Sequence, residues 1–257
     1  MLGAIAGDII GSIYERFNIR STEFPLFSAH SRFTDDTLLT VALADSIVYG
    51  DDYLFLLKWY YRNYPNAGFG GAFQNWARSE SLEPYNSWGN GSAMRVSPIG
   101  WAYDSLDEVL EQAKLSAEVT HNHPAGIAGA QAVASALFLA RTGNSKKAIK
   151  TYITDTFQYD LTDTLDNLRQ HYVFDVSCQG SVPQAIIAFL ESEDYEDCIR
   201  KAISIGGDSD TIACMAGGIA HAYYGSIPDK IKRETYARLD EPLTEVVFQF
   251  CEKFNCG

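Results

Sequence analysis

Two short acidic stretches, far apart in the chain, hold the residues best suited to chemistry. The first is Thr-Asp-Asp at residues 34–36, and the second is Asp-Ser-Asp-Thr at residues 208–211. Each is followed at once by an apolar run with helical spacing, so each stands at the expected start of a helix. Together they offer four carboxylates and several hydroxyl groups.

Helix capping is the simpler explanation of these stretches. Asp and Thr at a helix start accept hydrogen bonds from free backbone N–H groups and suit the positive end of the helix dipole. A cap needs only one side-chain oxygen, however, and the two stretches supply many more. Carboxylates that converge on one point repel one another unless a cation lies between them, and all-oxygen sets bind hard cations such as Mg²⁺, Mn²⁺ or Ca²⁺. Adjacent aspartates on one helical turn point about 100° apart, which favours two ions.

Three further segments contain candidate site residues. In residues 3–15 (GAIAGDIIGSIYE), a helix would place Asp8, Gly11 and Glu15 on one face, although a glutamate at a helix end is often simply solvated. In residues 86–100 (NSWGNGSAMRVSPIG), glycines let backbone N–H groups converge on an anion, and Trp88 offers a flat face for a base or sugar. The spacing fits neither a P-loop nor a dinucleotide fingerprint, so an ordinary loop remains an alternative.

Residues 119–132 (VTHNHPAGIAGAQA) place His121 and His123 before an Ala-rich helix. Pro124 suits the first position of that helix. Because no third nitrogen or sulfur ligand accompanies the histidines, we expect a substrate hydrogen bond or a cap-like role rather than a zinc site.

Helices must position these residues, because apolar positions recur at three- and four-residue spacing along most of the chain. The pattern predicts helices at residues 36–48, 53–62, 105–118, 125–141, 145–157, 181–192, 195–204, 210–224 and 242–254. Strand-like alternation is scarce, and no linker-like segment divides the chain. Glycines at 3, 7 and 11 predict a helix surface against which a neighbour packs closely. We therefore expect one all-α domain over residues 1–257.

Composition narrows the function classes. The 33 acidic and 20 basic residues give a net charge of −13, which repels phosphate backbones, and no basic patch offers a nucleic-acid site. No apolar run is long enough for a membrane span, and Asp8 interrupts the apolar N-terminus, so no signal peptide is expected. The five cysteines form no C-x-x-C pair and are expected to be reduced, in a cytoplasmic protein.

These five segments, on a helical background, resemble the ADP-ribosylglycohydrolase family, which includes the dinitrogenase-reductase-activating glycohydrolase and the ADP-ribosyl-acceptor hydrolases. The resemblance covers nearly the whole chain and implies an orthogonal multi-helix bundle around two Mg²⁺ ions, with Mn²⁺ as a substitute. It also implies a monomer that acts on an ADP-ribosylated protein or a small ADP-ribosyl conjugate.

The resemblance also assigns roles to residues of this sequence. The implied metal ligands are Thr34, Asp35, Asp36, Asp208, Asp210 and Thr211. The implied substrate-binding residues are Gly70, Gly71, Ser87, Trp88, Gly89, Asn90, Gly91, Ser92 and His121, with the loop at 87–92 holding a diphosphate. Glu15, Asp36 and Asp210 are the candidate catalytic residues, and the sequence does not choose between Glu15 and a metal-binding carboxylate as general acid or base.

The implied reaction is hydrolysis of the bond between the anomeric carbon of ADP-ribose and an acceptor such as an arginine side chain. Three alternatives remain open at this point. One is a hydrolase of O-acetyl-ADP-ribose or another small conjugate, or of ADP-ribose carried by nucleic acid. The second is a ribonucleoside hydrolase, which needs acidic metal chemistry but no anion-binding loop. The third is a binding-only or structural relative, against which the complete set of acidic residues argues.

Overall fold

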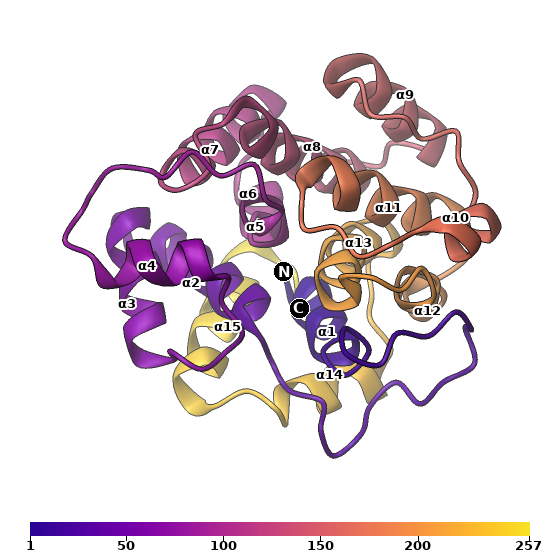
Figure 1. Ribbon diagram of the computed structural model, residues 1–257, viewed down its shortest axis with the longest axis horizontal. Helices are drawn as coiled ribbons and strands as arrows, with labels where there is room; N and C mark the ends of the chain where they lie inside the picture. The colour runs from indigo at the N-terminus through magenta and orange to yellow at the C-terminus, as the bar shows by residue number, and fades with distance from the viewer.

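The computed structural model describes residues 1–257 and consists of helices joined by turns and loops (Figure 1). No strand is present; the one β-bridge joins Gly89 and Ser177. The helices are α1 (Leu2–Gly11), α2 (Asp35–Tyr49), α3 (Tyr53–Asn63), α4 (Gly71–Arg78), α5 (Gly91–Met94), α6 (Ser97–Ala102), α7 (Leu106–Glu118), α8 (Pro124–Arg141), α9 (Lys146–Phe157), α10 (Leu165–His171), α11 (Cys178–Glu191), α12 (Tyr195–Ser204), α13 (Ser209–Tyr224), α14 (Asp229–Tyr236) and α15 (Glu241–Phe254). None of them combines the length and apolarity needed to cross a membrane.

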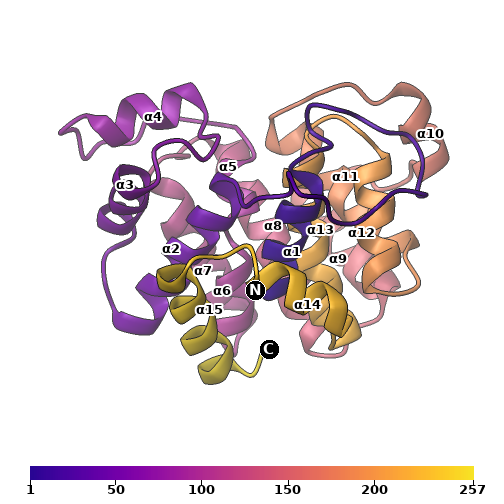
Figure 2. The same cartoon turned by 90° about the horizontal axis from the view of Figure 1, so that it is seen from below.

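The bundle is organised around the pair α1 and α13. Helix α13 also contacts α8, α11 and α12 on one side, while α1 contacts α2, which packs against α3 and α15 on the other. Viewed from below, α1 and α13 lie between α2, α3 and α15 on one side and α11 and α12 on the other (Figure 2). A single hydrophobic core of 70 buried residues runs through both groups, which confirms the prediction of one all-α domain.

The predicted helices are all present, with ends shifted by a few residues. The largest shift is in α11, which begins at Cys178 rather than residue 181 because the Ser177 side chain caps it by accepting a hydrogen bond from the Gly180 N–H. Helix α1 ends at Gly11, so Glu15 lies in the following turn rather than on the helix. The helices that the sequence did not predict are short or rich in turn residues, namely α4, α5, α6, α10 and α14.

Glycines allow α1 and α13 to approach until backbone meets backbone. A Cβ added at Gly7 would overlap the Ala213 carbonyl, and one added at Gly11 would lie 2.5 Å from the Cα of Asp210. The expected small-residue surface is therefore confirmed. Its consequence for the site is that the first turn of α13 lies directly against the last turn of α1.

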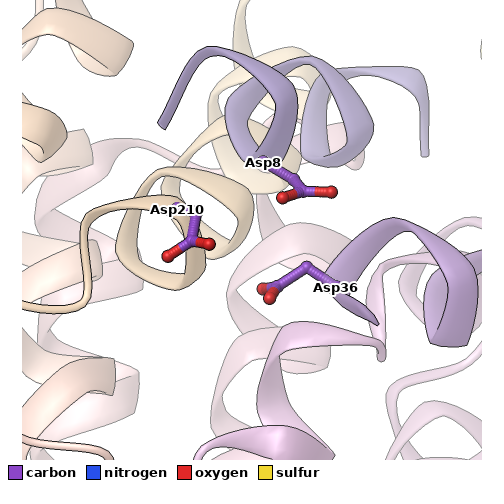
Figure 3. Close-up of side chains that lie close together, drawn as sticks. All are labelled: Asp8, Asp36 and Asp210. Atoms are coloured by element: carbon purple, nitrogen blue, oxygen red, sulfur yellow. The ribbon is translucent and has the colours of Figure 1, made fainter. Parts of the chain in front are cut away.

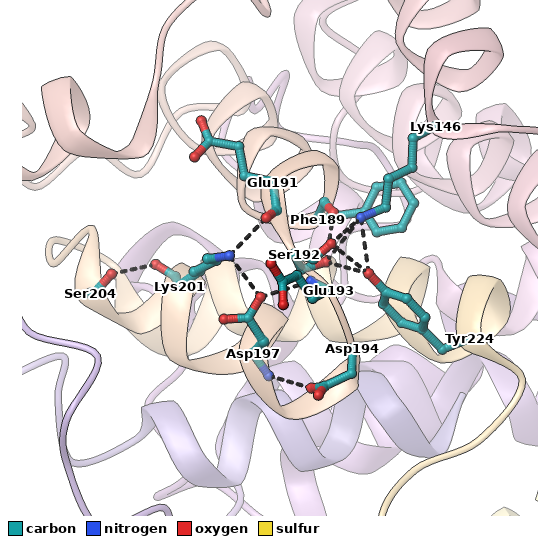
Figure 4. A network of polar contacts seen from close by, with 10 residues as sticks. All are labelled: Lys146, Phe189, Glu191, Ser192, Glu193, Asp194, Asp197, Lys201, Ser204 and Tyr224. Atoms are coloured by element: carbon teal, nitrogen blue, oxygen red, sulfur yellow. Dashed lines mark hydrogen bonds and ion pairs between the residues drawn. The ribbon is translucent and has the colours of Figure 1, made fainter.

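A lysine joins the outer helix α9 to the rest of the bundle (Figure 4). The Lys146 ammonium donates to the Ser192 carbonyl and to the Tyr224 hydroxyl, and it lies 5.1 Å from the centre of the Phe189 ring. Lys146 thus donates a hydrogen bond to a backbone carbonyl at the C-terminal end of α11 and makes a cation–π contact with Phe189. This network is structural and lies away from the acidic stretches.

The close approach of α1 and α13 can be tested with Gly7→Ala. The added methyl group must displace the α13 backbone, so we expect the free energy of unfolding in urea to fall by about 1–3 kcal/mol. The control is Gly71→Ala, also a helical glycine but with no atom within 4 Å of the added Cβ. We expect that control to be neutral or slightly stabilising. Equal stability of the two variants would contradict the packing described.

Candidate active site

Three buried aspartates from three helices point toward one another (Figure 3). Asp8 comes from α1, Asp36 from the first turn of α2, and Asp210 from the first turn of α13. One carboxylate oxygen of each lies within 4.8 Å of the others. Asp210 also belongs to a second such group with Glu15 and Asp208. The two acidic stretches of the sequence therefore meet, and Asp210 lies where the two groups overlap.

Asp8 fixes the start of α2 against α1. Its carboxylate accepts hydrogen bonds from the backbone N–H groups of Thr34 (3.0 Å) and Thr37 (3.1 Å) and from both threonine hydroxyls. These bonds use its oxygens, so Asp8 acts mainly by positioning Asp36. Sequence analysis placed Asp8 on the face of Glu15 but did not include it in the site. The available signal was an acidic residue inside an otherwise apolar helix.

Capping explains only a small part of the acidic stretches. Thr34 does cap α2, because its hydroxyl accepts from the Asp36 N–H. Asp208 stands at the cap position of α13 but makes no side-chain cap hydrogen bond. Its carboxylate instead accepts from the Asn90 side-chain amide at 2.6 Å. The Thr211 hydroxyl donates to Asp36 across the two helices at 3.2 Å. Most of these oxygens therefore face one another rather than the helix ends.

The cluster of carboxylates has the properties of a cation site. Burial raises the pKa of Asp36 and of Asp210 well above the usual aspartate range, and neighbouring carboxylates raise both further. Burial and the negative charge of Asp8 raise the pKa of Asp35 to about 8. In addition, Asp36 Oδ1 is buried without any hydrogen-bond partner. A divalent cation would satisfy that oxygen and offset the repulsion, and the all-oxygen donor set fits a hard ion.

A cavity of about 430 Å³ opens above these carboxylates. All six predicted metal ligands line it, as do Glu15, Gly70, Gly71, Ser87, Gly89, Asn90, Gly91 and His121. Segments that are distant in the sequence thus form one concave site. Its volume lies in the range of small-molecule sites.

The loop at 87–91 is held rigidly against the wall of this cavity. The Asn90 N–H donates to the Val176 carbonyl (2.8 Å), and the Asn90 side chain donates to Ser181 and Asp208. The N–H groups of Ser87 and Gly89 are also used within the protein, by the Thr120 carbonyl and the Ser87 hydroxyl. Only part of the loop's backbone is therefore left to bind a ligand.

Two predicted substrate residues do not line the cavity. Ser92 is fully buried and donates to the Gly126 carbonyl at 2.7 Å, so its hydroxyl stabilises the packing of α5 on α8. Trp88 is 52% exposed and is not among the residues that line the cavity. His123 caps α8 by accepting from the Ala125 N–H, which confirms the cap-like role expected for one of the two histidines.

Comparison with known proteins agrees with this geometry. The family profile described as ADP-ribosylglycohydrolase matches residues 1–255. The chain belongs to the ADP-ribosylglycohydrolase family. Human ADP-ribosylhydrolase ARH3 is 29% identical, in an alignment covering 88% of this chain and 84% of that protein. The ADP-ribosylarginine hydrolase Tri1 of Pseudomonas putida is 25% identical, over 96% of this chain and 76% of its own length.

A solved structure supports the family fold. The structure titled "ADP-ribosylglycohydrolase-related protein complex" superposes with a TM-score of 0.75 and 23% sequence identity, covering 98% of this chain and 96% of that one. The orthogonal helical bundle expected from the resemblance is therefore confirmed. Membership of the ADP-ribosylglycohydrolase family supports hydrolysis of ADP-ribose conjugates as the class of reaction.

Arg95 is a cavity-lining residue that sequence analysis did not identify. Its side chain is fully buried, and it faces no carboxylate within ion-pair distance. The only signal in the sequence was a single charged residue in the apolar segment SAMRVSPIG. Burying a charged side chain costs free energy unless the charge is paired and hydrogen-bonded.

The raised pKa values of the aspartates predict how metal and pH together affect stability. Asp35, whose usual pKa is 3.8, titrates at about 8 in the folded chain. The protonated carboxyl therefore contributes stability at low pH that is lost as the pH rises from about 4 through 8. With EDTA, we expect Tm to fall between pH 5 and pH 8. With Mg²⁺, the fall should be smaller, so the Mg²⁺-induced rise in Tm grows with pH. A Mg²⁺-induced shift that is independent of pH would contradict this account.

Proposed function

We propose that this protein is a Mg²⁺-dependent hydrolase of the glycosidic bond between ADP-ribose and an acceptor such as an arginine side chain of a protein. The observation that carries the proposal is the pair of carboxylate groups that share Asp210 at the floor of the cavity. A loop suited to anions forms the wall beside them. The proposal assigns cations to these carboxylates and a diphosphate to the loop, and an ADP-ribose conjugate requires both within one cavity.

The proposed metal ligands are Thr34, Asp35, Asp36, Asp208, Asp210 and Thr211, which would hold two Mg²⁺ ions or, in their place, Mn²⁺. When bound, such ions supply Lewis-acid polarisation and orient the hydroxyl groups of the substrate ribose. The overlap of the two acidic groups at Asp210 supports two ions rather than one. The buried, unpaired Oδ1 of Asp36 supports that residue as a ligand.

Glu15 is our candidate for the general acid or base. It is the one exposed acid of the two groups, and it lines the cavity. Partial burial and the negative charge of Asp208 raise the pKa of its carboxyl group, which favours proton transfer nearer to neutral pH. In the hydrolysis, water bonds to the anomeric carbon, the bond to the acceptor breaks, and a proton passes to the acceptor. The carboxylates of Asp36 and Asp210 would stabilise positive charge that develops on the ribose ring.

The walls of the cavity would bind the rest of the substrate. We assign the diphosphate to the loop at 87–91, with His121 and the glycines at 70 and 71 also lining the space. Trp88 belongs to this loop but not to the cavity lining, and it remains our candidate for contact with the adenosine end. The fixed position of the loop relative to Asp208 would set the distance between diphosphate and reaction centre.

The acceptor is assigned with support from one relative. The Pseudomonas putida protein Tri1, aligned over 96% of this chain, is named an ADP-ribosylarginine hydrolase. That name supports an arginine linkage here. A small conjugate such as O-acetyl-ADP-ribose would use the same cavity and is the alternative that the assay below must separate.

The proposal predicts Mg²⁺-dependent release of ADP-ribose. The assay measures free ADP-ribose released from arginine-linked, serine-linked and O-acetyl substrates, with Mg²⁺ and with EDTA. We expect release from the arginine-linked substrate in Mg²⁺ only. Asp36→Asn and Asp210→Asn should each lower kcat/KM by at least about 100-fold, since each removes a charge from the cation site. The surface variant Asp155→Asn is the matched control and should retain full activity.

Two results would count against the proposal. Unchanged turnover and metal binding in Asp36→Asn and Asp210→Asn would show that the acidic groups are not the reaction centre. Binding of ADP-ribose without release from any substrate would indicate a binding-only relative. Release from the O-acetyl substrate alone would retain the reaction but replace the acceptor.

A further inference from the structure

A buried arginine, Arg95, lines the cavity and has no acidic partner. Nη2 of Arg95 donates to the Ser116 carbonyl at 2.7 Å and to the Thr120 hydroxyl at 3.0 Å, while Nε and Nη1 have no partner. Burial lowers the pKa of Arg95 to about 10, so the guanidinium remains charged at neutral pH. A buried positive charge without an acidic partner costs free energy. Its hydrogen bond to Thr120 connects it to His121, which also lines the cavity.

The contacts continue from Arg95 through Thr120 to His121. Thr120 is fully buried, and its hydroxyl oxygen lies 2.7 Å from Nδ1 of His121. Because a guanidinium can only donate, Arg95 occupies a lone pair of the Thr120 oxygen. The hydroxyl proton then has one acceptor within reach, which is Nδ1 of His121. The opposite arrangement, with a proton on Nδ1, would leave the buried hydroxyl proton without an acceptor.

This arrangement fixes the tautomer of the imidazole. If Nδ1 accepts, the neutral ring carries its proton on Nε2. Nε2 makes no hydrogen bond within the protein, and His121 lines the cavity. Nε2 lies beside the anion-binding loop, 3.2 Å from where a Cβ would stand on Gly91 and 3.8 Å from the same point on Gly89. The ring therefore presents an N–H donor to the place assigned to the diphosphate.

We propose that Arg95 and Thr120 are positioning residues that hold His121 as the Nε2–H tautomer, so that it donates a hydrogen bond to a diphosphate oxygen of the ADP-ribose substrate. The proposal rests on the function proposed above. It gives the buried Arg95 a role, because the five acidic residues that line the cavity repel a diphosphate. It also means that His121 is not a metal ligand, since a protonated Nε2 has no lone pair to offer.

The test compares Thr120→Val, which has the same shape but no hydroxyl, with Thr120→Ser, which keeps the hydroxyl. The tautomer of His121 is measured from ¹⁵N chemical shifts of the imidazole nitrogens in the full-length protein. We expect Nε2–H in the wild type and in Thr120→Ser, and a mixture of tautomers in Thr120→Val. The Kd for ADP-ribose, from titration calorimetry, should rise about 10-fold in Thr120→Val, which corresponds to loss of one hydrogen bond. Thr120→Ser should bind within about twofold of the wild type.

Each outcome decides the proposal. A wild-type His121 with its proton on Nδ1 overturns it, and this measurement needs no variant. An unchanged tautomer in Thr120→Val also overturns it, as does an unchanged Kd. The tautomer does not depend on turnover, so failure of the proposed hydrolase activity is seen separately, in the ADP-ribose release assay. A KM effect without a kcat effect in Thr120→Val would support a role in binding rather than in the chemical step.

Discussion

The site depends on the contact between α1 and α13, two helices that approach until their backbones touch. Glycines on α1 make this possible, because any side chain at Gly7 or Gly11 would overlap the α13 backbone. Asp8 lies near the end of α1, and Asp210 lies at the start of α13. The contact between the two helices brings these carboxylates close together. Asp8 then draws in α2 through its hydrogen bonds to Thr34 and Thr37, and with α2 comes Asp36. One packing constraint thereby places three carboxylates from three helices.

That arrangement stores unfavourable electrostatic energy in the folded chain. Burial raises the pKa of every aspartate in the cluster, and neighbouring carboxylates raise the pKa of Asp35, Asp36 and Asp210 further. The charged forms are therefore poorly stabilised without a counter-ion. The large apolar core, with 70 buried residues, supplies stability that offsets this cost. Clustered buried carboxylates favour cation binding, and without a cation their mutual repulsion lowers the stability of the folded protein.

The loop at 87–91 is connected to the acidic side of the cavity through a few polar side chains. Asn90 connects the loop at 87–91 to Asp208, and the β-bridge between Gly89 and Ser177 fixes its outer edge. Arg95 lines the same cavity and adds a positive charge where acidic residues dominate. The two halves of the proposed substrate site are therefore held at a set separation, with opposite local charge.

The sequence alone determined the helical class, the main helices, and the two acidic stretches with the glycine-rich loop, because periodicity and residue chemistry are local properties. It also indicated the close-packing face of α1 from three glycines. It did not show that the Asp8 carboxylate accepts its hydrogen bonds from the start of α2, that the Ser92 side chain is buried in the protein, or that Trp88 does not line the cavity. Nor did it show that Arg95 is connected to His121 through Thr120. Each of these depends on which helices meet and on which atoms face each other across them, and only the tertiary structure decides that.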